Sequence, residues 1–172
     1  MYRILICDDQ PDIVNALKIY LAPEGYQLFT ACNGLEALET VRKEDIHLVL
    51  LDIKHIEPEH HRKLTGHTNE KILAFAEYLS QKQVPIWVRH VMVPTITDDE
   101  KYLYDLGWFL GGLTNLKALD VLPYHTMGEV KYQKLGVEYK LKGIPAMDKD
   151  KVIEKKQVIL NGIRKRREEL GI

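Results

Sequence analysis

The chain has 172 residues, of which 45% are hydrophobic, and its formal net charge is −1. These values favour one globular domain with a normal core, and they give no general attraction to nucleic acid or to an anionic membrane. No apolar run is long enough to cross a bilayer, and the N-terminus lacks a signal-peptide layout, so we expect a cytoplasmic protein that needs no partner, with a monomer favoured.

Short apolar runs alternate along the chain with segments of helical periodicity. Strands are predicted at 2–7, 26–31, 47–53, 84–91 and 119–123. Helices are predicted between and after them, at 12–21, 35–42, 69–81, 97–113 and 148–170. Thr97 with Glu100 forms a capping-box pattern, so the fourth helix is expected to begin at the threonine. The segment 124–145 is longer than an ordinary loop between a strand and a helix.

Strict alternation of strands and helices predicts a parallel sheet that is covered on both faces. Five strands are too few for a closed eight-stranded barrel. Right-handed crossovers then favour a doubly wound, flavodoxin-like sheet of strand order 2-1-3-4-5 in a single α/β domain over 1–172.

Acidic residues follow two strands that are neighbours in this order. Asp8 and Asp9 come after the first strand, and Asp52 stands near the end of the third. The carboxyl ends of neighbouring parallel strands meet, so the three carboxylates are expected to lie close together and to repel one another. A hard cation such as Mg²⁺ relieves that repulsion. The sequence therefore predicts a metal site at Asp8, Asp9 and Asp52.

Residues 2–53 resemble the first half of a response-regulator receiver domain. The resemblance is carried, in order, by Ile4-Leu5-Ile6-Cys7-Asp8-Asp9, Glu24-Gly25-Tyr26, Asn33-Gly34-Leu35-Glu36-Ala37-Leu38 and Leu50-Leu51-Asp52. It implies that Asp52 is a phosphoacceptor. The second half of the family's pattern is absent, because Arg89-His90 stands where a receiver has Ser or Thr, and Leu122 precedes Pro123 where it has Lys. A phosphoaccepting receiver is kept as an alternative function.

Residues 49–160 resemble the second half of a glycyl-radical-enzyme activase of the pyruvate formate-lyase activating type. The matching segments are Leu51-Asp52-Ile53-Lys54-His55-Ile56, Lys63-Leu64-Thr65-Gly66, Trp87-Val88-Arg89-His90-Val91, Ile96-Thr97-Asp98-Asp99 and Val121-Leu122-Pro123-Tyr124-His125. The family has a partial βα barrel, an iron–sulfur cluster and S-adenosylmethionine. The resemblance implies that Asp52, Lys54, Arg89 and His125 lie near S-adenosylmethionine and its neighbouring cation.

The family's cluster motif, Cys-x-x-x-Cys-x-x-Cys, is missing. Cys7 and Cys32 are the chain's two cysteines, their spacing differs from the motif, and thiolates are what such a cluster requires. We therefore expect an engineered fold chimera that joins fragments 1–52 and 53–172. It is expected to be no enzyme, to hold no iron–sulfur cluster and to have Mg²⁺ as its one candidate cofactor. A remnant that binds S-adenosylmethionine is the second alternative.

Two further interpretations concern single side chains. Arg89 or Lys54 is expected to neutralise the acidic group, in place of the missing receiver lysine. Trp87 and Trp108 are interpreted as core or helix–sheet packing rather than as stacking platforms.

Overall fold

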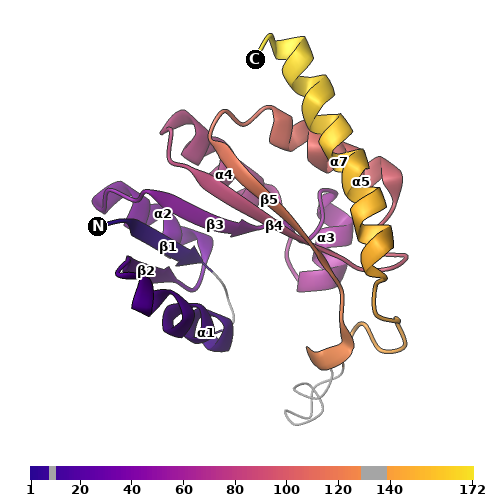
Figure 1. The fold of residues 1–172 in the computed structure, drawn as a ribbon, viewed down its shortest axis with the longest axis horizontal. Coiled ribbons are helices and arrows are strands. Elements are labelled where there is room, and N and C mark those ends of the chain that lie inside the picture. Colours follow the sequence, from indigo (N-terminus) through magenta and orange to yellow (C-terminus); the bar gives the residue numbers. More distant parts are fainter. Residues whose placement is uncertain (8–10, 129–138) are drawn as a thin grey trace. The chain divides into compact units, whose positions relative to one another are not determined.

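The computed structural model describes residues 1–7, 11–128 and 139–172. Its strands form one sheet of order β2-β1-β3-β4-β5, as predicted, and every pair whose register is known is parallel (Figure 1). The strands are β1 (Arg3–Cys7), β2 (Gln27–Ala31), β3 (Leu48–Asp52), β4 (Ile86–Met92) and β5 (Leu116–Pro123). The predicted metal ligands Asp8 and Asp9 lie outside the described residues.

The helices follow the predicted alternation with one addition. They are α1 (Pro11–Leu21), α2 (Gly34–Lys43), α3 (Pro58–Thr65), α4 (Glu70–Gln81), α5 (Glu100–Gly111) and α7 (Lys149–Leu170), with short 3₁₀ turns at Ala22–Glu24 and Thr126–Gly128. Helix α3 was not predicted, because its sequence has too few apolar residues to show a helical stripe. Its ends explain why it forms: the Glu57 carboxylate accepts from the His60 amide at 2.8 Å, and Gly66 ends the helix at φ 94°, a conformation that suits glycine.

The described residues pack as two compact units. The first comprises Met1–Ile53, Glu70–Arg89 and Leu113–Asp120, and the second comprises Lys54–Asn69, His90–Gly112 and Val121–Ile172. The predicted single domain over 1–172, built from fragments 1–52 and 53–172, stays a prediction.

The first unit has one well-covered sheet face. Val49, Ile86 and Val88 are fully buried, and α2 and α4 contact each other, so they lie on one side of the sheet. The alternate residues of β3 and β4 point the other way and are partly exposed: Leu50, Asp52, Trp87 and Arg89. This second face of β3 and β4 is therefore less fully buried than the face that carries Val49, Ile86 and Val88.

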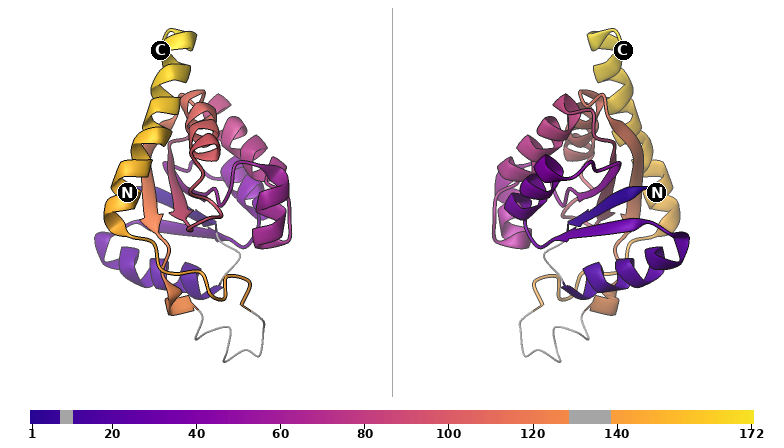
Figure 2. Two further views of the ribbon diagram at one scale, coloured as in Figure 1. Left: turned by 90° about the vertical axis from the view of Figure 1, so that its right-hand side faces the viewer. Right: turned by 90° about the vertical axis from the view of Figure 1, so that its left-hand side faces the viewer.

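The second unit is organised by the close packing of α5 against α7, which run side by side in Figures 1 and 2. Glycines make this approach possible. A Cβ atom at Gly107 would overlap the carbonyl oxygen of Ile159, and one at Gly162 would overlap that of Tyr104. In the described part of the chain, no helix has the length and apolar character needed to cross a membrane.

Candidate functional site

An ion pair stands on the partly exposed face of the first unit. The register of β3 and β4 places Asp52 beside Arg89, and Arg89 Nε donates to Asp52 Oδ1 at 2.8 Å. The two side chains are 19% and 20% exposed, so the pair is shielded from bulk water but reachable. The expectation that Arg89 neutralises this acidic group is confirmed for Asp52.

Two other predicted site residues, Lys54 and His125, do not belong to the unit that contains the Asp52–Arg89 pair. Lys54 is half-buried and His125 is exposed, and both belong to the second unit. Within the ranges 1–7, 11–128 and 139–172, no group of three or more His, Cys, Asp or Glu side chains is arranged to hold a metal ion. The roles predicted for Lys54, His125 and the three aspartates stay predictions.

The second unit contains a cluster of aromatic rings that the sequence did not reveal. His55, His60 and Tyr102 meet edge to face, with centroid distances of 4.9, 4.8 and 5.0 Å. His55 is 1% exposed, and its Nδ1 accepts from the Glu57 amide at 3.0 Å. Burial, followed by the charge of His60, lowers the pKa of His55 to about 4. This imidazole is therefore neutral at physiological pH.

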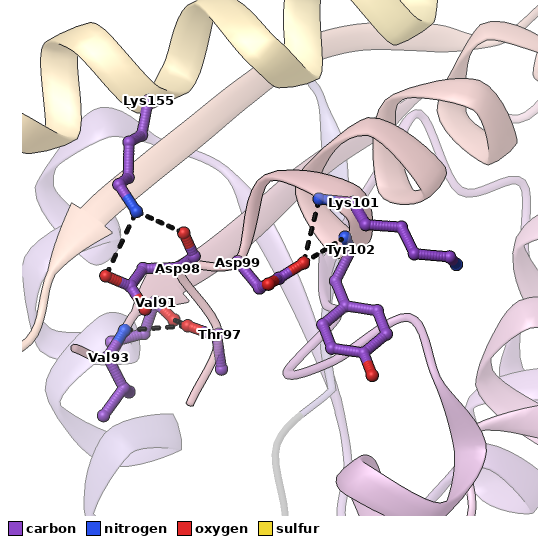
Figure 3. Close-up of polar contacts among 8 residues, drawn as sticks. All are labelled: Val91, Val93, Thr97, Asp98, Asp99, Lys101, Tyr102 and Lys155. Atoms are coloured by element: carbon purple, nitrogen blue, oxygen red, sulfur yellow. Dashed lines mark hydrogen bonds and ion pairs between the residues drawn. The ribbon is translucent and has the colours of Figure 1, made fainter. Parts of the chain in front are cut away.

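The loop between β4 and α5 is fixed by short hydrogen bonds in the second unit (Figure 3). The Thr97 hydroxyl donates to the Val91 carbonyl at 2.9 Å and accepts from the Val93 amide at 2.7 Å. Asp99 is the helix cap, because its carboxylate accepts from the Lys101 amide at 2.9 Å. The prediction that Thr97 caps α5 is therefore wrong, since its hydroxyl closes the loop by bonding to Val91 and Val93 instead. Asp98 is held by Lys155 of α7 at 3.2 Å.

The two tryptophans differ from one another. Trp108 packs against Tyr104, with ring centroids 6.3 Å apart, and the Arg166 guanidinium lies 5.0 Å from its ring. Trp87 is 36% exposed, and its Nε1 donates to Asp120 Oδ2 at 3.1 Å. Trp108 is thus packed within the second unit, and Trp87 lies on the partly exposed face of the first.

Comparison with known proteins decides the family. The model of the radical SAM superfamily matches residues 5–107, which is more than half of the chain. The chain belongs to the radical SAM superfamily. The activase resemblance expected from the strand-end motifs is thus confirmed at the level of the superfamily.

Similar curated proteins support a more specific relationship. A pyruvate formate-lyase-activating enzyme from Listeria monocytogenes is 51% identical over 105 residues, covering 61% of this chain and 42% of that protein. One from Streptococcus mutans is 46% identical over 112 residues, covering 65% and 43%. The chain therefore spans less than half the length of these relatives.

Solved structures extend the likeness to the fold. A domain of a pyruvate formate-lyase-activating enzyme from Bacteroides vulgatus superposes with a TM-score of 0.64 at 16% identity, covering 94% of this chain and 95% of that chain. Response regulators are also among the structures found. One from Thermotoga maritima has a TM-score of 0.45 at 27% identity and covers 78% of this chain and 98% of that chain.

These comparisons correct three predictions. The description of the chain as an engineered chimera without activity is wrong, because its superfamily and its relatives point to a radical SAM activase. The prediction that it is no enzyme is wrong for the same reason. The prediction that the protein holds no iron–sulfur cluster is also wrong, because radical SAM activating enzymes bind such a cluster and S-adenosylmethionine. The Mg²⁺ prediction stays a prediction.

The cysteines of the chain do not by themselves fit that cluster. The sequence has two, Cys7 and Cys32, whereas the family's motif supplies three closely spaced thiolates. Cys7 ends β1 and Cys32 follows β2, so the two stand on neighbouring strands rather than in one loop. A cluster used by this protein therefore takes at least one ligand from outside these 172 residues or from a side chain other than cysteine.

Proposed function

We propose that this chain carries the S-adenosylmethionine-binding strands of a pyruvate formate-lyase-activating type of enzyme and works in the cytoplasm. The observation that carries the proposal is the Asp52–Arg89 pair, in a chain whose superfamily is named for this cosubstrate. The 51% identity to an activating enzyme supports the same class of activity.

The chemistry of the pair suits the amino-acid end of S-adenosylmethionine. That end is a zwitterion with an α-carboxylate and an α-ammonium group. A guanidinium binds a carboxylate through parallel hydrogen bonds, and a carboxylate accepts from an ammonium. Arg89 and Asp52 already form an ion pair at 2.8 Å without the ligand. When the ligand binds, its carboxylate pairs with Arg89 and its ammonium pairs with Asp52, so neither side chain is left as an unpaired charge in a partly buried place.

The other two residues that the sequence places near the ligand, Lys54 and His125, belong to the second unit, and their roles stay predictions. Lys54 follows β3 by two residues, and His125 follows β5 by two residues. Strand ends are where open parallel sheets bind their ligands. When bound to its own ligands, the iron–sulfur cluster supplies the electron for the family's radical chemistry.

Isothermal calorimetry with S-adenosylmethionine tests the proposal on the purified chain. Arg89→Gln is expected to weaken binding at least tenfold, because a charge-assisted pair is worth about 1.5–3 kcal/mol. Arg62→Gln is the matched control, since Arg62 also pairs with a carboxylate, that of Glu59, but both side chains are more than half exposed. Equal affinities of the two variants, or no heat of binding in the parent protein, would refute the proposal.

A further inference from the structure

Strand β2 is an edge of the sheet, and in the described part of the chain it pairs with β1 alone. The Gln27 amide donates to the Tyr2 carbonyl at 2.8 Å, on the β1 side. In a parallel ladder, alternate residues direct their backbone groups to the same neighbour, so Phe29 also bonds toward β1. The backbone N–H and C=O groups of Leu28 and Thr30 therefore point to the open side of the sheet.

Strand β2 lacks the features that keep a sheet edge from pairing with another chain. Such edges are usually protected by charged side chains or by proline. The sequence of β2, Gln-Leu-Phe-Thr-Ala, contains neither, whereas the opposite edge, β5, carries Lys117, Asp120 and Pro123. Of the two edges, β2 is therefore the one suited to accept a further strand through its main chain.

A groove of about 260 Å³ lies between β2 and α2 in the first unit. Phe29 and Thr30 line it from the strand, and glutamates line it from the helix and the residue that follows the helix: Glu36, Glu39 and Glu44. A strand added to β2 would direct alternate side chains to the same face of the sheet. The groove therefore offers such a strand one apolar contact and several carboxylates.

Glu36 brings a negative charge that no cation offsets in the described part of the chain. Its two oxygens accept from the Cys32 amide and from Asn33 Nδ2, each at 2.8 Å, and both donors are neutral. The other two glutamates of the groove face a lysine or an arginine, at 3.5 and 3.8 Å. The charge of Glu36 is thus available to a cationic side chain from outside.

We propose that the outer edge of β2 binds an extended, basic segment of a protein partner. The segment adds a sixth strand to the sheet by bonding to the backbone of Leu28 and Thr30. One lysine or arginine of the segment reaches Glu36, and an apolar side chain two residues along lies against Phe29. A second copy of this chain fits less well, because pairing β2 with its own equivalent sets the same glutamates of two grooves against each other.

A peptide of alternating lysine and valine, titrated into the full chain, tests the proposal. It is expected to bind saturably, and to bind more weakly as salt rises. Amide hydrogen exchange is expected to slow at Leu28 and Thr30, whereas the Phe29 amide, which already bonds toward β1, should be unaffected. Equal binding of a peptide of alternating glutamate and valine, or unchanged exchange at Leu28 and Thr30, would overturn the proposal.

Two pairs of variants separate the main-chain contribution from the charge. Thr30→Pro removes one outward N–H without removing a bond to β1, and it is expected to weaken binding of the lysine peptide about 2- to 12-fold, while Thr30→Val should bind as the parent does. Glu36→Gln should weaken binding about 2- to 5-fold at low salt. Glu77→Gln is its control, because it removes the same charge from an exposed position on α4.

Circular dichroism verifies that each variant is folded. If Thr30→Pro does not fold, the exchange pattern of the parent protein and the Glu36→Gln affinity still decide the question. Parent-like affinity of a folded Thr30→Pro protein would overturn the proposal. So would a dimer, detected by sedimentation, that forms through β2 and that the lysine peptide does not displace, since the edge would then belong to a second copy. None of these outcomes depends on S-adenosylmethionine, so the proposed function is tested separately.

Discussion

The buried imidazole of His55 makes the stability of the second unit depend on pH. The ordinary histidine pKa of 6.5 is lowered to about 4 in the folded protein, chiefly by burial and next by the charge of His60, with His90 adding to the effect and the Ile96 backbone and Glu57 opposing it. The unfolded chain therefore takes up a proton near pH 6.5, whereas the folded chain does so only near pH 4. The stabilisation is complete above pH 6.5, declines as pH falls, and is lost below about pH 4.

The size of the effect follows from the shift. One pKa unit corresponds to about 1.4 kcal/mol, so a shift from 6.5 to about 4 lowers the free energy of unfolding by about 3 kcal/mol between pH 7 and pH 4. Burial of His55 is nearly complete, at 1% exposed, so screening by solvent does not reduce this figure much. A loss of this size is a large part of the stability of a small unit.

Urea unfolding at several pH values between 7 and 4 measures this loss. A Trp87→Phe background leaves Trp108, which belongs to the second unit, as the fluorescent reporter. In the His55→Gln variant, the free energy of unfolding is expected to fall by about 3 kcal/mol less between pH 7 and pH 4 than in the parent protein. His67→Gln is the matched control, because His67 is exposed on the same segment and outside the ring cluster. The reasoning is refuted if the His55 and His67 variants show the same slope.

Three further perturbations test the packing and the polar contacts. Gly107→Ala forces a methyl group against the Ile159 carbonyl and should destabilise the α5–α7 contact by about 1–3 kcal/mol. Gly112→Ala is the control and should be nearly neutral, because its added methyl group meets nothing closer than 3.4 Å. Equal melting temperatures of the two variants would contradict this prediction. Thr97→Val removes both hydrogen bonds of the hydroxyl and should cost about 1–3 kcal/mol in urea unfolding, while Thr97→Ser should retain most of the stability. Asp52→Ala removes the carboxylate that pairs with the partly buried Arg89 guanidinium and should destabilise the first unit by about 1–3 kcal/mol. Trp87 fluorescence in the Trp108→Phe background reports unfolding of this unit. An unchanged unfolding midpoint would mean that water replaces the lost carboxylate at no cost in stability.

The strand order was predictable because it depends on features that extend along the whole chain. Alternation of apolar runs with helical stripes requires parallel strands, and the handedness of the crossovers leaves few arrangements. Helix α3 was missed because eight mostly polar residues carry no periodic signal, and only its two ends, at Glu57 and Gly66, specify it. Local capping therefore formed an element that hydrophobic patterning could not predict.

The candidate site was predictable in part. The Asp52–Arg89 pair follows from neighbouring strands, and both residues were named in advance. The cap of α5 was misassigned because Thr97, Asp98 and Asp99 are all good capping residues, and their choice depends on where the loop closes.

The prediction that the chain is no enzyme was wrong because it depended on a single motif, the three cysteines of the iron–sulfur cluster. Cluster ligation depends on a few thiolates in one short motif, so a missing motif removes the signal completely. In the proposed function, recognition of the adenosyl ligand depends instead on side chains at strand ends, of which Asp52 and Arg89 are two. Because the superfamily match extends over residues 5–107, it includes the strands that carry these side chains as well as the N-terminal part that lacks the motif. The superfamily match therefore stands without the cluster motif, and iron analysis of the protein with its cellular partners addresses the source of the thiolates.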